Sequence, residues 1–179
     1  AAGDYRRELS LETAVHTGSY RVDGRAYTRE CFVSHPAQVL AIRIACDRAG
    51  SVGFAARLSP KLRARRLEEG GAAYIDGYCP VCLAPYGHTY GSDAEKLYAD
   101  ADEEKGVGCR AGLKVVAAGG TVAVSGAGIT VAGADEAVVY VAVRTSFNGP
   151  FRHPVTDGRP YREPCAGDLE AAAQKGFEA

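Results

Sequence analysis

The chain has no methionine and no tryptophan, and its 179 residues carry a net charge of only −1. Since it opens on Ala1 and stops at Ala179 inside a helix-like segment, we expect an excised piece of a larger protein. The near-zero charge argues against a nucleic-acid partner, which would require a basic footprint. Because no apolar run approaches the length of a membrane span, no membrane partner is expected either.

Local signatures of catalysis are also missing. No glycine-rich phosphate loop precedes a helix, no serine elbow is present, and no serine-type triad can be read from the spacing. The acidic run within residues 100–104 is typical of a solvated surface, because paired catalytic carboxylates need environments that separate their pKa values. We therefore expect no catalytic residue and no cofactor in this chain.

What the sequence does contain is apolar and polar alternation of period two, the pattern of half-buried strands. Asp23-Gly24 between two such segments predicts a hairpin turn. The segment 137–143 is almost wholly apolar, which predicts a central strand covered on both faces. The alternating segments are 13–22, 27–33, 38–46, 52–58, 107–115, 121–124 and 129–131. Short strands at this spacing predict an all-β fold, an antiparallel β-sandwich.

Two regions depart from this pattern. Residues 59–106 mix proline, glycine, tyrosine and charge without a clear period, so we expect a long excursion there, with only a short strand near 72–75. A polar loop is expected over 146–166, after which Asp168 would cap a helix that begins near Leu169. The expected division is a sandwich domain over 1–165 and the start of a linker helix over 166–179.

Three of the six cysteines, Cys31, Cys46 and Cys109, lie in strand-like segments. We interpret them as small buried hydrophobic side chains. Unpaired cysteines of this kind favour a reducing compartment such as a bacterial cytoplasm.

Cys79 and Cys82 form a CxxC pair, which could hold zinc or form a redox disulfide. His88 is the nearest further ligand, while Cys109 or Cys165 would have to be brought in by the fold. Because a second CxxC and a βαβ context are both missing, we favour two cysteines that are free or bridged to each other, and we predict no metal site.

Four residues in the expected loops could contact a sugar. Aromatic faces stack on the C–H surface of sugars and polar tips bind their hydroxyl groups. The alternative is that these side chains simply pack within their own loops. The candidates are Tyr86, Asn148, Arg152 and His153.

Several short segments resemble, in order, the N-terminal domain of glycoside hydrolase family 95, the inverting α-L-fucosidase family. Residues 4–14 are similar to its Y-R-R-x-L-x-L-x-x-A stretch, and residues 27–34 to its Y-x-R-E-x-F-x-S strand. Gln38-Val39-Leu40 fits the start of the following strand, and residues 105–109 resemble its G-K-G-M-x-F segment, with Val107 in place of the usual Met. The other matching segments are 119–122 (G-G-x-V), 133–135 (G-A-D) and 145–149 (T-S-F-N-G).

The resemblance implies a large N-terminal β-sandwich whose partner is an (α/α)6 catalytic barrel further along the same polypeptide. In the family that barrel carries a Glu general acid and an Asp with Asn helpers that activate water, and none of these positions lies in this chain. Strands that precede Tyr5 in the family are also missing, so exposed strand edges could support self-association. The function implied is a non-catalytic domain that supports the barrel and meets carbohydrate only indirectly.

Two other functions are compatible with the same residues. A stand-alone carbohydrate-binding module would bind sugar by itself, although the absence of tryptophan counts against it. A zinc-stabilised interaction domain would be built on Cys79 and Cys82.

Overall fold

The computed structural model describes residues 2–83, 96–99, 101 and 104–178, and it confirms an antiparallel β-sandwich with a C-terminal helix. Eight strands form the main sheet: β1 (Gly3–Leu9), β2 (His16–Val22), β3 (Arg25–Ser34), β4 (Val39–Cys46), β13 (Glu136–Thr145), β10 (Gly108–Ala118), β7 (Ala72–Tyr78) and β6 (Ala64–Glu69), in that spatial order. A smaller sheet has the order β11 (Thr121–Ser125), β12 (Gly128–Ala134) and β5 (Val52–Ala56). The short strands β8 (Cys82–Leu83) and β9 (Lys96–Leu97) pair with each other.

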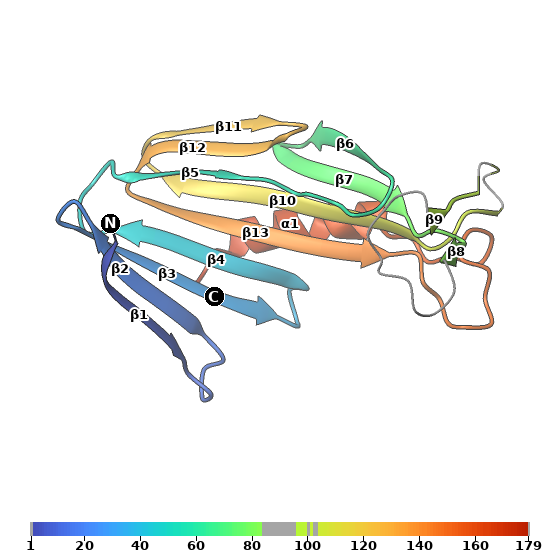
Figure 1. The fold of residues 1–179 in the computed structure, drawn as a ribbon, viewed down its shortest axis with the longest axis horizontal. Coiled ribbons are helices and arrows are strands. Elements are labelled where there is room, and N and C mark those ends of the chain that lie inside the picture. The colour runs from blue at the N-terminus through green and yellow to red at the C-terminus, as the bar shows by residue number, and fades with distance from the viewer. Residues whose placement is uncertain (1, 84–95, 100, 102–103, 179) are drawn as a thin grey trace.

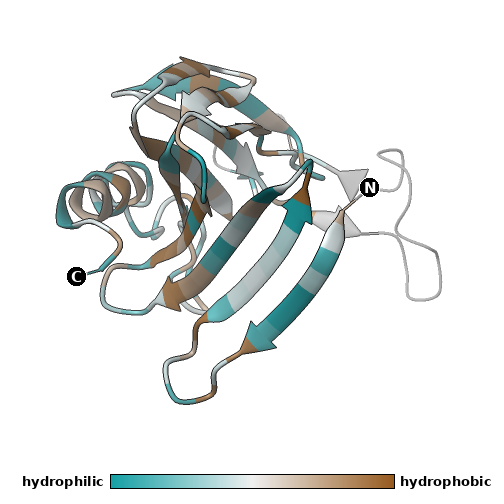
Figure 2. Ribbon diagram, turned by 90° about the vertical axis from the view of Figure 1, so that its left-hand side faces the viewer, coloured by the Kyte–Doolittle hydropathy of each residue, from teal (hydrophilic) through white to brown (hydrophobic). Residues whose placement is uncertain are grey.

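Three layers result from this arrangement. The smaller sheet lies over β7, β10 and β13, while helix α1 (Arg162–Lys175) packs on the opposite face of the main sheet (Figure 1). Seen from the side, β1, β2 and β3 extend beyond the smaller sheet (Figure 2). Among the described residues, no helix is both long enough and apolar enough to cross a bilayer.

The predicted hairpin and central strand are both confirmed. Asp23 and Gly24 have φ values of 50° and 75° between β2 and β3, which is the left-handed backbone of a tight hairpin turn. β13 lies between β4 and β10, with Tyr140 in the core beneath α1 and Val139 in the core beneath the smaller sheet. This double coverage explains why the strand is apolar at nearly every position.

The expected excursion over 59–106 is shorter than predicted, since β6 and β7 both belong to the main sheet. β7 is covered on both faces, with Ala72, Ala73 and Tyr74 all buried, and a strand buried on both sides loses its period of two. β6 is an edge strand rich in charge, as edges that avoid further pairing usually are. Residues 84–95, the middle of the predicted 76–105 loop, lie outside the described residues.

The helix begins earlier than predicted, at Arg162 rather than near Leu169. Pro164 falls in its first turn, where proline is tolerated because the missing N–H would have had no partner. Asp168 is therefore not a cap: it lies inside the helix, where its Oδ2 accepts a hydrogen bond from Nε of Arg144 at 2.6 Å. The second polar loop accordingly runs over 146–161 instead of 146–166.

Close contact between α1 and the sheet depends on a glycine. Leu169, the most central side chain of the helix, is fully buried. A Cβ atom on Gly112 of β10 would lie 2.6 Å from side-chain atoms of both Leu169 and Tyr74. The missing side chain at position 112 thus lets the helix approach the strand.

Part of one face of the main sheet is not covered by the smaller sheet. Leu9, His16, Cys31, Ile42 and Val139 form one row across β1, β2, β3, β4 and β13, so their side chains share a face. Only the β4 and β13 members of the row belong to the core beneath the smaller sheet. Toward β1 the apolar side chains are exposed, as at Tyr5 (63%), Leu9 (58%) and Val33 (76%).

Candidate functional site

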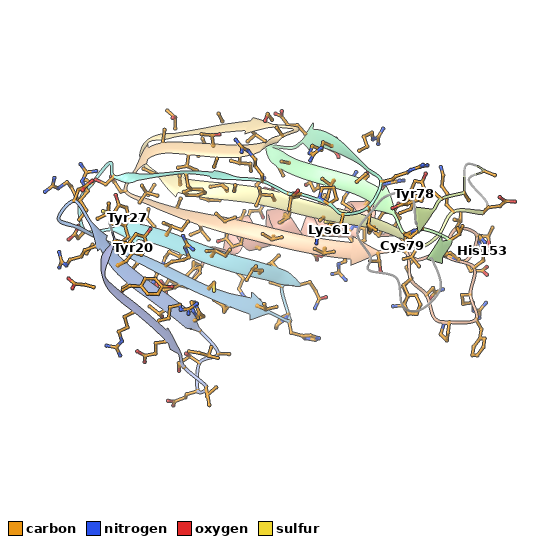
Figure 3. All side chains as sticks on the ribbon, viewed as in Figure 1. Tyr20, Tyr27, Lys61, Tyr78, Cys79 and His153 are labelled. Atoms are coloured by element: carbon orange, nitrogen blue, oxygen red, sulfur yellow. The ribbon has the colours of Figure 1, made fainter. Side chains whose placement is uncertain are left out.

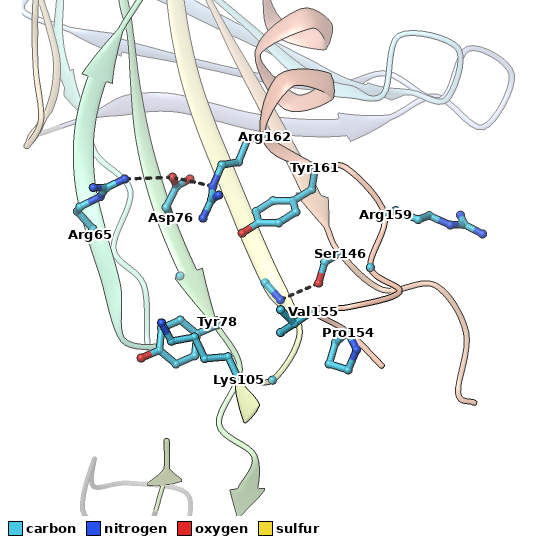
Figure 4. A pocket seen from close by; sticks show the side chains of 14 residues that line it. Arg65, Asp76, Tyr78, Lys105, Ser146, Pro154, Val155, Arg159, Tyr161 and Arg162 are labelled. Atoms are coloured by element: carbon cyan, nitrogen blue, oxygen red, sulfur yellow. Dashed lines mark hydrogen bonds and ion pairs between the residues drawn. The ribbon is translucent and has the colours of Figure 1, made fainter. Parts of the chain in front are cut away.

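A cavity of about 610 Å³ lies at one end of the main sheet. The end of β7, the start of β10, the loop 146–161 and the first residues of α1 all contribute to its wall (Figure 4). A concave site of this size with several convergent polar groups is the usual form of a small-molecule site. It is therefore the feature of the described structure from which we build a candidate site.

Asp76 is the central charged group of this site. Asp76 on β7 lies directly opposite Arg110 on β10, and Arg65 on β6 lies opposite it on the other side. Both oxygens of its carboxylate accept hydrogen bonds from Arg110, at 2.7 Å from Nε and 2.9 Å from Nη2. Since the Asp76 and Arg110 side chains are only 6% and 8% exposed, this is a buried, bidentate ion pair.

The same carboxylate faces two further arginines. Nε of Arg162, from the first turn of α1, lies 3.3 Å from Oδ2, and Nη2 of Arg65 lies 3.8 Å from that oxygen. Burial by itself raises the pKa of Asp76, but the hydrogen bond from Arg110 and the charges of the three arginines outweigh it and lower the pKa below its usual range. Asp76 is therefore firmly ionised at neutral pH.

Ser146 fixes the loop that forms the opposite wall. Its Oγ accepts the N–H of Gly108 at 2.9 Å, and its own N–H donates to the Gly108 carbonyl at 2.8 Å. Its carbonyl accepts the N–H of Arg159 at 3.0 Å, which closes the loop on itself. A Cβ on Gly108 would lie 2.7 Å from the hydroxyl oxygen of Tyr161, so glycine is needed there for the tyrosine to pack beside the cavity. Two of the segments that carry the family resemblance, 105–109 and 145–149, thus contact each other at this site.

Three of the predicted sugar contacts, Asn148, Arg152 and His153, lie in this loop, and two of them shape it. Nδ2 of Asn148 donates to the Asp157 carbonyl at 2.8 Å, and its Oδ1 accepts from Nε of Arg159 at 2.9 Å. Nδ1 of His153 accepts the N–H groups of Val155 and Thr156, each at 3.3 Å.

His153 lies at the same end of the molecule as Tyr78 and Cys79 (Figure 3). Arg152 is exposed, and Tyr86 lies outside the described residues. The proposed contact of these four residues with sugar remains a prediction.

The cysteines predicted as weak metal ligands are only partly brought together. The thiols of Cys79 and Cys109 are free and half-buried, and burial together with the nearby Cys79 raises the pKa of Cys109. Cys165 is instead a residue of α1 itself, fully buried on the side of the helix that faces the main sheet, where its Sγ donates to the carbonyls of Ala142 and Arg110 at 3.6 and 3.7 Å. Its burial raises its pKa to about 11.

The side chain of Cys82 and the whole of His88 lie outside the described residues. Within the described part of the chain, no three metal-ligating side chains form a group. The three strand cysteines were predicted to be buried, but all of them are only half-buried: Cys31, Cys46 and Cys109. Cys31 lies 3.8 Å from Nδ1 of His16, so it meets a polar neighbour rather than a closed core.

The arginine and aspartate row was not found from the sequence. Arg65, Asp76 and Arg110 are separated by 11 and 34 positions, and only the pairing of β6, β7 and β10 aligns them. The one signal in the sequence was the charge of Asp76, which follows the short strand expected near 72–75 and faces charged residues of the strands paired with it. That signal could not be used, because no strand was expected at β6 and the short strand expected near 72–75 ends before Asp76.

Comparison with known proteins identifies the kind of domain. Residues 1–150 match the family described as glycosyl hydrolase family 65, N-terminal domain. The chain belongs to this family. It is thus an N-terminal domain of the glycoside hydrolase type, in agreement with the coarser part of the resemblance found in its sequence.

Two relatives extend this assignment. The chain is 33% identical over 177 residues to Alpha-L-fucosidase 2 of Arabidopsis thaliana, an alignment that covers 97% of this chain and 21% of that protein. Among solved structures it resembles a putative kojibiose phosphorylase from human microbiome, with a TM-score of 0.51 and 9% identity, over 99% of this chain and 23% of that one. At that identity the likeness concerns the fold alone. The chain therefore spans about a fifth of the curated relative that it matches.

Proposed function

We propose that this chain is the non-catalytic N-terminal β-sandwich of a glycoside hydrolase that resembles the family 95 α-L-fucosidases. The whole enzyme would hydrolyse glycosidic bonds in an (α/α)6 barrel elsewhere in the polypeptide. The observation that carries this proposal is the alignment with Alpha-L-fucosidase 2, which takes in nearly all of this chain but only a fifth of the relative.

The incomplete second layer of the sandwich supports a partner within the same polypeptide. The exposed side chains of Tyr5, Leu9 and Val33 lie on the part of the main sheet that the smaller sheet leaves uncovered. Strands with one apolar face are stable when that face is covered, so further chain of the parent enzyme is the proposed cover. In solution without that cover, the edge strand β1 could pair with a second copy.

The domain boundaries also follow from this proposal. Residues 1–165 would form the supporting sandwich, and residues 166–179 would lead toward the barrel. Because α1 starts at Arg162 and packs on the main sheet through Leu169, its first turns are part of the sandwich itself. Phe177, which follows the helix, also packs on Phe32 of β3, so a linker would begin only beyond this contact.

A comparison of this chain with the complete enzyme tests the proposal. Both proteins would be assayed with 4-nitrophenyl α-L-fucoside and with the corresponding α-galactoside, because the sugar preference belongs to the barrel. The complete enzyme is expected to release 4-nitrophenol, whereas the 179-residue chain is expected to release none. Turnover by the 179-residue chain alone, or an intact enzyme without glycosidase activity, would refute the assignment.

A second experiment tests whether the loop 146–161 lies near the substrate. In the complete enzyme, Arg152→Ala and His153→Ala are expected to lower kcat/KM, as are Asn148→Ala and Tyr86→Ala. Arg152→Ala is the most informative of these variants, because Asn148 and His153 also stabilise the conformation of the loop, so their replacement could lower kcat/KM indirectly. An unchanged kcat/KM for Arg152→Ala and Tyr86→Ala would remove the loops from the substrate path.

A further inference from the structure

The cavity at the end of the main sheet carries more positive than negative charge. Arg65, Lys105, Arg159 and Arg162 line it, and among the described residues its one acidic lining side chain is Asp76. The carboxylate of Asp76 is already neutralised by its two hydrogen bonds to Arg110 behind it. Arg65 and Arg162 therefore add positive charge to the cavity beyond the charge of Arg110 that already balances the Asp76 carboxylate.

These two arginines are placed to act together. Both approach the same oxygen, Oδ2 of Asp76, one from the edge strand β6 and the other from the first turn of α1. Their side chains are 77% and 54% exposed, so much of each planar guanidinium group faces solvent. A guanidinium has five N–H donors in a fixed fork, which suits the paired oxygens of a carboxylate or phosphate.

The start of helix α1 also favours a negatively charged ligand. α1 has 14 residues and starts beside the cavity, and the residue before it, Tyr161, makes no capping hydrogen bond through its side chain. The start of a helix carries a partial positive charge and exposes backbone N–H groups, and both favour an anion. This contribution adds to the arginine pair and does not replace it.

The remaining wall fits an organic body attached to the anion. Tyr78 and Tyr161 present aromatic rings, and Pro154 and Val155 add an apolar surface (Figure 4). Tyrosine rings pack against the C–H faces of sugars while their hydroxyl groups remain hydrogen-bonded. A volume of about 610 Å³ lies within the usual range for small-molecule sites.

We propose that this cavity binds a sugar bearing a carboxylate or phosphate group, with the oxyanion between Arg65 and Arg162 and the ring against Tyr78 and Tyr161. The sugar part of this inference rests on the proposed role in a glycoside hydrolase. The anion part does not depend on that role: it rests on the arginine pair, with the start of α1 as an addition. The site lies in the sandwich, outside the proposed catalytic barrel. Binding here would therefore hold an acidic sugar near the substrate path, or act as a regulatory signal to the barrel.

Titration of the 179-residue chain tests the proposal. Isotope-labelled protein would be followed by NMR with four probes in turn: glucuronate, glucose 6-phosphate, neutral glucose and inorganic phosphate. At least one anionic sugar is expected to shift the signals of Tyr78 and Tyr161 at a lower concentration than glucose or phosphate does. Comparison of glucuronate with glucose 6-phosphate then distinguishes a carboxylate ligand from a phosphate ligand.

Two variants link the binding to the arginines. Arg65→Gln and Arg162→Gln are each expected to weaken binding about tenfold, because each removes a charge-assisted hydrogen bond. Both side chains are largely exposed, so these variants should fold. Arg66→Gln is the matched control: it removes the same charge from the adjacent, exposed position of β6, whose side chain points to the other face of the sheet.

Three results would overturn the proposal. These are equal affinity for glucose and both anionic sugars, equal losses in the Arg65 and Arg66 variants, and no response of the cavity residues to either anionic sugar. None of these results bears on the release of 4-nitrophenol by the complete enzyme, so failure here is separate from failure of the proposed function.

Discussion

Replacing Asp76 by Asn is expected to destabilise the domain strongly, although the change alters almost no volume. The substitution removes the negative charge that faces the buried guanidinium of Arg110, whose side chain is 8% exposed. Among the described residues, the close carboxylate left to Arg110 would be that of Glu69, at 3.4 Å and 63% exposed. A charged group left in the interior without a buried counter-ion cannot recover the hydration that it lost on folding.

The size of the loss follows from this geometry. Breaking a buried ion pair by removing one partner typically costs about 3–5 kcal/mol. The Asn side chain can still accept one hydrogen bond, so we expect a loss of about 3 kcal/mol in the free energy of unfolding. For a chain of this length, this corresponds to a fall of about 6–12 °C in Tm.

The loss should depend on pH in a defined direction. The folded-state pKa of Asp76 lies below its usual value, so the carboxylate stabilises the fold at pH values above about 4, where the unfolded chain is also ionised. This stabilisation is lost as the pH falls through the folded-state pKa. The difference in stability between the native protein and Asp76→Asn should therefore shrink on acidification below pH 4.

Urea unfolding at pH 7 and pH 3, followed by circular dichroism, measures both effects. Glu69→Gln is the control, because it removes the exposed partner of the same arginine and should cost less than about 1 kcal/mol. The double variant Asp76→Leu with Arg110→Met should recover most of the loss, since apolar replacements leave no unpaired charge. If Asp76→Asn costs no more than Glu69→Gln, the ion pair is not the buried, stabilising contact described here.

Three further predictions concern the core. Gly112→Ala should cost about 1–3 kcal/mol in chemical unfolding, because its Cβ would clash with Leu169 and Tyr74; a neutral effect would show that α1 can shift away freely. Leu169→Ala should cost about 3–5 kcal/mol in the same assay, since the fully buried side chain leaves a cavity, and a loss below 1 kcal/mol would mean that the helix is loosely docked. Cys165 should resist iodoacetamide at pH 8 until urea unfolds the protein, because it is fully buried and has a pKa of about 11. The half-buried Cys79 should react first, and rapid labelling of Cys165 in the native protein would contradict its buried position.

The fold class could be predicted because some strands, such as β5 of the smaller sheet, are covered on one face and exposed on the other. Val52, Phe54 and Ala56 alternate with exposed or half-exposed neighbours and indeed face the core beneath the smaller sheet. The Asp23-Gly24 turn was equally local, because a residue pair that tolerates positive φ suffices to define it. These features need only neighbouring residues to be recognised.

The segments that were missed, or predicted only in part, depend on residues distant in the chain. Only a short strand near 72–75 was expected where β7 lies, because β7 is covered by α1 on one face and by the smaller sheet on the other, and its pattern resembles none of the half-buried strands. The early start of α1 was hidden by Pro164, which is a breaker in the middle of a helix but acceptable in its first turn. In both cases the interpretation of a residue changed with its tertiary surroundings.

By itself the sequence determined the alternating strands, the hairpin turn and the ordered motifs typical of a glycoside hydrolase N-terminal domain, because each is a property of residues close together in the chain. Only the tertiary structure decided that Arg65, Asp76, Arg110 and Arg162 meet at one cavity, since strand pairing and helix docking bring them together from four separate elements. The same convergence buries Asp76 and Arg110 while it leaves Arg65 and Arg162 open to solvent, and no local pattern in the sequence encodes that difference.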